Sequence, residues 1–508
     1  MTASPPVPTP LTPRQFRAAT AAVMMTILLG ALDQTIVSVA LPSIARQLGG
    51  FEWMAWVISG YLIAATVVTP LYGKFSDLFG RRRVLGAAIV IFVLASVACA
   101  LARTMPQLVL ARVLQGVGGG GLIALAQAVV ADVVPLRDRG RYQSYISIVW
   151  VVASMLGPVV GGVLTEQLSW PWIFWINLPT GLLALVLVET SLRKLPLHRG
   201  EARIDGLGAL LLLAGLTAAL IPITRVGQGG DWHEPANLAG WALAAVLLAA
   251  FVRQQRRHPE PIVPMALLAN PGVVAGCAML FLLFFNFIAL SVLVPLRVQM
   301  VAGMNATDAA LHLLPMTLAV PCAAFLGGRW LARTGRVRPP QWVGVVLVPL
   351  ALVGLSFAPA TGVAAMLGLV VVGLGMGLQL STTLITVQQS VPRAMIGTVT
   401  GLTGFFRLLG GAIGIAVLST VALLLLRAHL PADVHAVVGE SPSALLGTAR
   451  GANPASDAAF RQLMQVCALV ALLSLWFVRR MPDLHLHDTH HDSHADRAAA
   501  PAAPAAVE

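Results

Sequence analysis

The stretch GKFSDLFGRRRV, residues 73 to 84, places five charged side chains between two long apolar runs. The chain around it has 508 residues, of which 57% are hydrophobic and only 11% are charged. Apolar runs of about 18 to 25 residues recur along it, and a helix of about 20 apolar residues crosses a bilayer core. Lipid offers the backbone no hydrogen bonds, so these runs must be helices. The sequence therefore predicts an all-α polytopic membrane protein.

Fourteen apolar runs are long enough to span a membrane. We expect spans at residues 18–40, 54–72, 84–102, 106–130, 142–164, 172–192, 206–226, 237–253, 272–296, 308–331, 341–358, 362–386, 397–426 and 462–479. Alternate loops hold about 18 Lys and Arg residues, whereas the other loops hold about 7. Because basic loops stay in the cytoplasm, both termini are expected there.

The composition also bears on partners and chemistry. A net charge of +12 could indicate nucleic-acid binding, but the charge lies in short loops between spans, so no nucleic-acid partner is predicted. The four cysteines lack CxxC spacing, so we expect neither a disulfide nor a metal site. The sequence contains no HExxH, GxSxG or P-loop lysine motif. We therefore expect no enzyme activity, no cofactor and no ATP-driven transport.

An internal repeat divides the chain into two halves. GKFSDLFGR at 73–81 matches GRWLARTGR at 328–336, and three glycines around 118 match three around 375, at offsets of 255 and 257. Repeats of this kind build secondary transporters. The expected organisation is a disordered N-terminus at 1–17, a six-helix bundle at 18–192, a linker with two inserted spans at 193–253, a second six-helix bundle at 254–480 with a long outer loop at 427–461, and a disordered tail at 481–508.

Five motifs in order resemble the major facilitator superfamily, specifically its fourteen-span drug:proton antiporter family. They are LDQTIVSVALP (Leu32–Pro42), GKFSDLFGRRR (Gly73–Arg83), RVLQGVGGG (Arg112–Gly120), GPVVGG (Gly157–Gly162) and WPWIFWINLPTG (Trp170–Gly181). The last departs from the family pattern, because Pro171 stands where the family often has a basic residue. The resemblance implies the major facilitator fold, a small-molecule substrate, and a place in the bacterial cytoplasmic membrane.

Asp33 is a carboxylate within the first predicted span. Intramembrane acids are costly and usually mark function. Removal from water favours the neutral form, which would let Asp33 take up and release protons. We expect Asp33 to couple protons to transport. The alternative is a structural Asp that is hydrogen-bonded near the outer end of the span.

Arg112 lies several residues into the fourth predicted span. An arginine there should face the protein interior rather than lipid. The resemblance implies a part in proton coupling, and because a guanidinium does not release a proton near pH 7, that part must be electrostatic. The alternative is that the side chain reaches out to the membrane surface.

The loop between the second and third spans is expected to act as a cytoplasmic gate, formed by Gly73, Asp77, Gly80, Arg81 and Arg82. A continuous helix would pair Asp77 with Arg81, four residues later. The glycines would let the turn pack closely. The resemblance implies that Asp77 accepts hydrogen bonds from a neighbouring helix end and holds the cytoplasmic side shut. The alternative is that the basic residues only fix topology.

The fifth predicted span contains Gly157, Pro158, Gly161 and Gly162. Its glycines give a smooth surface for close helix packing, and Pro158 removes one backbone donor. In the family this motif marks exporters and is thought to seal the cavity against leak. The run Gly116–Gly121 formally fits GxGxxG, but within an apolar span it is better explained by helix packing than by nucleotide binding.

Two further segments suggest partners. The tail LHLHDTHHDSHADR could bind a transition metal, although a disordered cytoplasmic tail explains it better. The outer loop at 427–461 could contact a periplasmic adaptor protein, as fourteen-span relatives often do.

The expected function is multidrug efflux, in which downhill proton entry drives the export of hydrophobic or cationic drugs and confers antibiotic resistance. One alternative is a dedicated exporter of a single endogenous metabolite or antibiotic. Another, outside transport, is a membrane sensor or assembly factor with the same fold, which would tolerate replacement of Asp33 by Asn.

Overall fold

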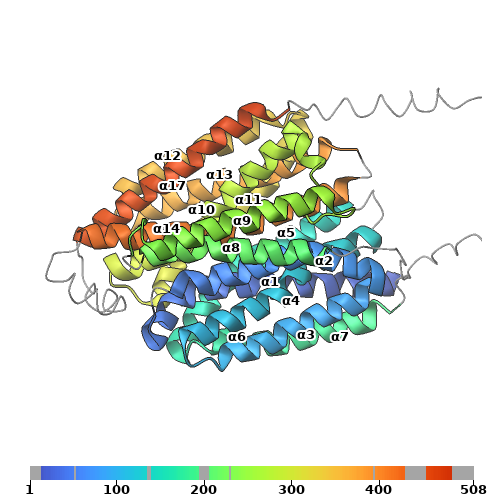
Figure 1. The fold of residues 1–508 in the computed structure, drawn as a ribbon, viewed down its shortest axis with the longest axis horizontal. Helices are drawn as coiled ribbons and strands as arrows, with labels where there is room; N and C mark the ends of the chain where they lie inside the picture. Colours follow the sequence, from blue (N-terminus) through green and yellow to red (C-terminus); the bar gives the residue numbers. More distant parts are fainter. Residues whose placement is uncertain are drawn as a thin grey trace, which may run out of the picture.

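The computed structural model describes residues 13–482, except 51–52, 134–138, 194–204, 228–229, 393–394 and 430–453. The described part is a set of helices joined by short turns (Figure 1). Fourteen of its spans are long and apolar enough to cross a membrane, as the sequence predicts. Most of both predicted disordered ends lies outside the described residues, as do the His-rich tail and most of the outer loop.

The N-terminal bundle consists of six spans. They are α1 (Pro13–Leu48), α2 (Met54–Phe79), α3 (Arg81–Ala100), α4 (Met105–Val133), α5 (Arg139–Gln167), and the pair α6 (Trp172–Trp175) and α7 (Asn177–Ser191), which share one span. Only one residue, Gly80, separates α2 from α3. Its φ of 87° lies in a region that favours glycine, so the chain can turn back at once.

The two inserted spans, α8 (Gly206–Gly227) and α9 (Pro235–Arg257), pack against each other. The carboxylate of Asp205, just before α8, accepts hydrogen bonds from Gln254 and Gln255 at the end of α9. α8 also contacts α14 (Ile396–His429) and α2, where Thr420 of α14 donates to the carbonyl oxygen of Ile223. The inserted pair therefore lies over the line where the two bundles meet.

The C-terminal bundle also consists of six spans. Besides α14 they are α10 (Pro271–Val301), α11 (Ala306–Thr334), α12 (Arg338–Phe357), α13 (Val363–Gln389) and α17 (Pro454–Arg480), and the short η2 (Leu267–Ala269) precedes α10. Side-chain caps begin two of these helices: Asn270 accepts from the amide of Gly272, and Asn305 accepts from that of Asp308. Their positions fix where α10 and α11 start.

The two glycine runs pack equivalently in the two bundles, which confirms the packing interpretation of these runs. In α4, Gly116 and Gly120 lie against the backbone of α2, and Gly118 lies against the backbone of α3. The matching glycines of α13 alternate in the same way between α11 and α12; they are Gly373, Gly375 and Gly377. A side chain at any of these positions would meet the neighbouring helix within 3 Å. The repeat in the sequence is therefore a repeat in three dimensions.

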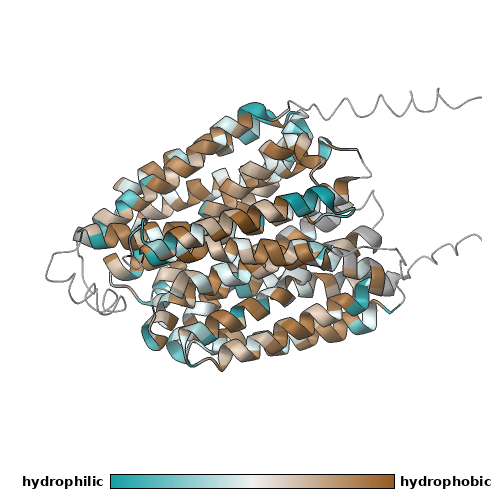
Figure 2. Cartoon of the chain, viewed as in Figure 1, coloured by the Kyte–Doolittle hydropathy of each residue, from teal (hydrophilic) through white to brown (hydrophobic). Residues whose placement is uncertain are grey.

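Two helix pairs join the bundles: α5 packs on α11, and α2 packs on α14. In the repeat, α2 corresponds to α11 and α5 to α14, so the two contacts are equivalent to each other. Apolar residues cover most of the length of the helices, and polar residues gather toward their ends (Figure 2). This pattern is typical of a bundle that is surrounded by lipid over its middle.

Candidate functional site

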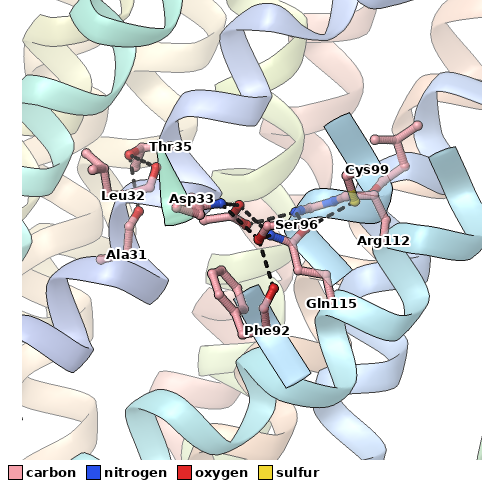
Figure 3. A network of polar contacts seen from close by, with 11 residues as sticks. Ala31, Leu32, Asp33, Thr35, Phe92, Ser96, Cys99, Arg112 and Gln115 are labelled. Atoms are coloured by element: carbon pink, nitrogen blue, oxygen red, sulfur yellow. Dashed lines mark hydrogen bonds and ion pairs between the residues drawn. The ribbon is translucent and has the colours of Figure 1, made fainter. Parts of the chain in front are cut away.

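Asp33 lies near the middle of α1 and is fully buried, with 0% of its surface exposed. Its carboxylate faces the interior of the N-terminal bundle, where α1, α3, α4 and α7 meet (Figure 3). It therefore does not lie near the outer end of its helix, as the structural alternative supposed.

Arg112 of α4 is also buried and forms an ion pair with Asp33, with 2.8 Å between Nη1 and Oδ2. Its Nε donates to the carbonyl oxygen of Val57 at 3.1 Å. The guanidinium lies 4.3 Å from the ring centre of Tyr61, close enough for a cation–π interaction. Because these contacts hold the side chain inside the bundle, it does not reach out to the membrane surface.

Two amide side chains complete the site. Gln115 and Asn177 each donate to Oδ1 of Asp33, at 2.9 and 2.8 Å. Both amides also donate to the hydroxyl of Ser96, at 2.7 and 3.3 Å. We call Asp33, Ser96, Arg112, Gln115 and Asn177 the Asp33 cluster. Two amides and one guanidinium donate to the carboxylate, so both of its oxygens are hydrogen-bonded although it is buried.

The sequence contains a signal for the two amides, although reasoning from it did not assign them a role. Gln115 lies three residues after Arg112, so both side chains share one face of α4. Asn177 belongs to the motif that opens the sixth span. Polar residues in apolar spans are rare. A buried acid needs polar partners, so these residues are the first candidates for its neighbours.

The predicted gate residues lie at the end of the bundle where the basic loops gather. Arg81 donates to the hydroxyl of Ser76. Arg82 forms an ion pair with Glu189 of α7 at 2.8 Å, within the same bundle. Both partners of this pair are more than one-third exposed, so it contributes little to stability. A gating function for these residues stays a prediction.

The helix is interrupted in the gate loop, and the pairing of Asp77 with Arg81 stays a prediction. α2 ends at Phe79 and α3 begins at Arg81, so no continuous helix carries Asp77 and Arg81 at i, i+4 spacing. A Cβ atom on Gly73 would meet no described atom within 4 Å, so close packing does not explain this glycine. The side chain of Asp77 lies outside the described residues.

The glycines of the predicted antiporter motif contact two helices. Gly157 lies against Thr35, and a Cβ on Gly161 would lie 2.9 Å from the carbonyl oxygen of Ile36. Both contacts are with α1, two and three residues after Asp33. A Cβ on Gly162 would lie 2.8 Å from Cα of Thr307, in the other bundle. Pro158 lies between these glycines, within α5.

Hydrogen bonds join the bundles at the end that the charge pattern predicts to be outside. Glu166 at the end of α5 accepts from the backbone amide and the hydroxyl of Thr307, at 3.0 and 2.6 Å. We call this contact the Glu166–Thr307 latch. Arg46 of α1 donates to Gln299 of α10 at 3.5 Å. These contacts hold the outer ends of the bundles together.

At the opposite ends of the bridging helices, three glycines face no described atom. A Cβ atom on Gly401 or Gly404, in the first turns of α14, would meet no described atom within 4 Å, and the same holds for Gly328 near the end of α11. In the part of the chain that the structure describes, no three His, Cys, Asp or Glu side chains come together as a metal site.

Comparison with known sequences supports a transporter. A family model described as Major Facilitator Superfamily matches residues 23–415. An uncharacterized MFS-type transporter of Mycobacterium tuberculosis is 36% identical over 400 residues, which cover 78% of this chain and 58% of that protein. The multidrug transporter protein MdtP of Bacillus subtilis is 30% identical over 394 residues, covering 77% and 72%. The chain thus spans somewhat more than half the length of the mycobacterial relative.

Solved structures share the fold at low sequence identity. A bacterial homologue of the human lysosomal transporter Spinster, in an inward-facing and unoccupied conformation, aligns with a TM-score of 0.66. Its sequence is 15% identical, and the alignment covers 92% of this chain and 97% of that one. This similarity concerns the arrangement of the helices, not the substrate.

Proposed function

Because the chain belongs to the Major Facilitator Superfamily, we propose that it is a proton-coupled secondary transporter that exports hydrophobic or cationic organic compounds across the bacterial cytoplasmic membrane. The observation that carries the proposal is the buried ion pair between Asp33 and Arg112. An acid and a base that are both removed from water within a membrane-spanning bundle mark an ion pathway. The name of the relative MdtP supports a drug-like substrate.

Protonation of Asp33 would change which contacts hold α1 to α4. A neutral carboxyl group loses its charge attraction to Arg112. The guanidinium keeps its hydrogen bonds to the carbonyl oxygen of Val57, at 3.1 Å, and to Oε1 of Gln115, at 2.5 Å. Arg112 therefore stays in place while the link to α1 weakens. The proton acts on the position of α1 rather than on that of α4.

α1 also connects the Asp33 cluster to the contact between the bundles. Thr35 donates to the carbonyl oxygen of Ala153 in α5 at 3.1 Å, next to the glycine surface of that helix. The same α5 carries Gly162 and Glu166 against Thr307 of α11. A shift of α1 would therefore disturb the closed outer end. In this scheme the closed outer end belongs to the state in which Asp33 has given up its proton.

The transport cycle follows from these contacts. In the outward-facing state Asp33 takes a proton, and in the inward-facing state it gives the proton up while the substrate binds. Inward proton movement is downhill by about 2.3 kcal/mol per 100 mV, to which the pH difference adds. This energy drives the substrate out. Both termini are proposed to lie in the cytoplasm, and an adaptor at the outer loop belongs to the same proposal.

The test compares Asp33→Asn with wild type in inside-out membrane vesicles, loaded with a fluorescent cationic dye under an imposed pH gradient. We expect Asp33→Asn to lose uphill accumulation by at least about tenfold, a change of about 1.4 kcal/mol, and to keep downhill dye exchange. Asp205→Asn is the matched control, because its carboxylate also accepts from two Gln amides but lies outside the bundles. Uphill transport by Asp33→Asn at the wild-type rate would refute the proposal.

A further inference from the structure

Arg407 is a second arginine within a span, and it lies on α14 where the two bundles meet. One turn later, Gly410 packs against the backbone of Phe281 in α10, and Gly411 lies beside Leu62 of α2. One turn earlier, a Cβ atom on Gly404 would meet no described atom within 4 Å. Arg407 therefore lies one turn closer to the predicted cytoplasmic end than the point where α2, α10 and α14 converge. The open space on this face of α14 extends toward the predicted cytoplasmic end.

An aromatic stripe on α10 lies beside Arg407. From Leu280 to Met300, α10 is buried except at five partly exposed positions that follow helical spacing. They are Phe281, Phe284, Phe287, Ile288 and Ser291. The guanidinium carbon of Arg407 lies 4.4 Å from the ring centre of Phe284, whose ring meets that of Phe287 edge-on at 5.8 Å. The guanidinium of Arg407 and the aromatic rings of α10 therefore lie side by side.

Arg407 differs from the other deeply placed arginines in its partners. Arg112 pairs with Asp33, and Arg297 pairs with Asp457 at 3.1 Å. No described carboxylate pairs with Arg407, and its Nε is buried without a hydrogen-bond partner. Arg407 is partly exposed, and a guanidinium within a span that has no described acid beside it favours any anion that can reach it. Phe284 covers one face of the guanidinium, and Nε is left without an acceptor.

We propose that Arg407 and the aromatic stripe form a substrate subsite for aromatic carboxylates, including zwitterions that carry a carboxylate beside a cationic group. The planar guanidinium offers parallel N–H donors that match a carboxylate. The aromatic part of the substrate lies on Phe284 and Phe287. The inference rests on the proposed function and narrows its substrate class, since a compound without a carboxylate would leave the guanidinium without an acceptor.

The experiment measures binding of two probes to the purified protein in detergent: a rhodamine with a free carboxylate and its methyl ester. We expect Arg407→Gln to weaken binding of the carboxylate dye by at least about tenfold, because a charged hydrogen-bond pair is lost. Binding of the ester should change less than about twofold. Arg407→Lys should retain part of the carboxylate preference, and Phe284→Leu should weaken both dyes alike.

Stability provides a second readout. If Arg407 has no resident partner, Arg407→Gln should leave the thermal unfolding midpoint of the ligand-free protein unchanged or raised. Equal weakening of both dyes, no binding of the carboxylate dye to wild type, or a lowered midpoint would each overturn the subsite. Dye binding in detergent does not require a proton gradient. Asp33→Asn should therefore still bind the carboxylate dye more tightly than its methyl ester. A failure of proton coupling is therefore distinguishable from a failure of this subsite.

Discussion

The two six-helix bundles share one architecture but differ in chemistry at equivalent positions. Gly116 touches the backbone of Tyr61, and the matching Gly373 touches that of Met316. The repeat thereby aligns Tyr61, Arg112 and Gln115 of the first bundle with Met316, Leu369 and Val372 of the second. All six side chains are buried. Two polar groups that donate to a carboxylate, and a tyrosine that lies against one of them, are replaced by three apolar side chains.

This difference teaches that the geometry of transport and its ion chemistry are separable. The glycine contacts fix how helices pack, and both bundles need them because both must move as rigid bodies. We expect proton handling to need a fully buried acid with its partners. The first bundle has such an acid in Asp33, whereas Asp457 of the second bundle, which pairs with Arg297, is partly exposed. The second bundle contributes Arg407, a cation with which no described carboxylate pairs. We infer that the first bundle handles the proton and the second handles the substrate.

The largest effect is expected when the first bundle is made to resemble the second. Arg112→Leu reproduces the equivalent residue and leaves Asp33 as an unpaired buried charge. Such a change costs about 3–5 kcal/mol in the free energy of unfolding. Thermal unfolding of the purified protein measures the loss.

A compensating change separates charge from packing. Adding Asp33→Asn to Arg112→Leu should recover most of the lost stability, because no charge then remains unpaired. Transport should stay absent, because the group that we propose to take up the proton is gone. If Arg112→Leu alone were as stable as wild type, the ion pair would not contribute to the free energy of unfolding. The chemical difference between the two bundles would then have no consequence for stability.

A smaller effect is expected at the glycine surfaces, where the bundles should behave alike. Gly161 of α5 packs on α1, and Gly414 of α14 packs on the corresponding α10. Alanine at either position would force a Cβ atom against backbone and should cost about 1–3 kcal/mol. Gly404→Ala is the control, since a Cβ there meets no described atom within 4 Å. A loss at only one of Gly161 and Gly414, with the other behaving like Gly404→Ala, would show that the packing symmetry is only superficial.

The architecture could be predicted from the sequence because it depends on periodic features. Span number follows from apolar length, and the two bundles follow from motifs that repeat at offsets of 255 and 257. Glycine runs inside apolar segments indicate helix packing, and the contacts of Gly116 to Gly120 confirm this. These signals are local and recur, so they can be read without knowing which helices touch.

The site could be predicted only in part, for a physical reason. A buried acid and a buried base can be identified singly, because each is expensive in a membrane. Their pairing joins residues 79 positions apart, and the contact with Asn177 spans 144. Sequence spacing carries no information about such distances. The Glu166–Thr307 latch was also missed, since an exposed glutamate at a helix end looks like any surface residue.

That latch gives the smallest expected effect and tests whether outer closure depends on contacts between the bundles. Glu166 is exposed and accepts from an amide at the start of α11, an arrangement worth about 0.3–1 kcal/mol. Glu166→Gln should therefore shift the population toward outward opening by at most about fivefold. Spin labels at Leu168 and Ala302, both exposed near the outer ends, would report a larger fraction of long distances.

Glu189→Gln is the matched control for this experiment, because Glu189 pairs with Arg82 inside a single bundle. Its loss should leave the distances between the spin labels unchanged, although it removes an exposed acid of the same kind. If both variants shifted the distances equally, general surface charge would explain the effect. If neither did, the outer ends would be held by apolar packing and by the contact of Gly162 with Thr307, and closure would not depend on the carboxylate.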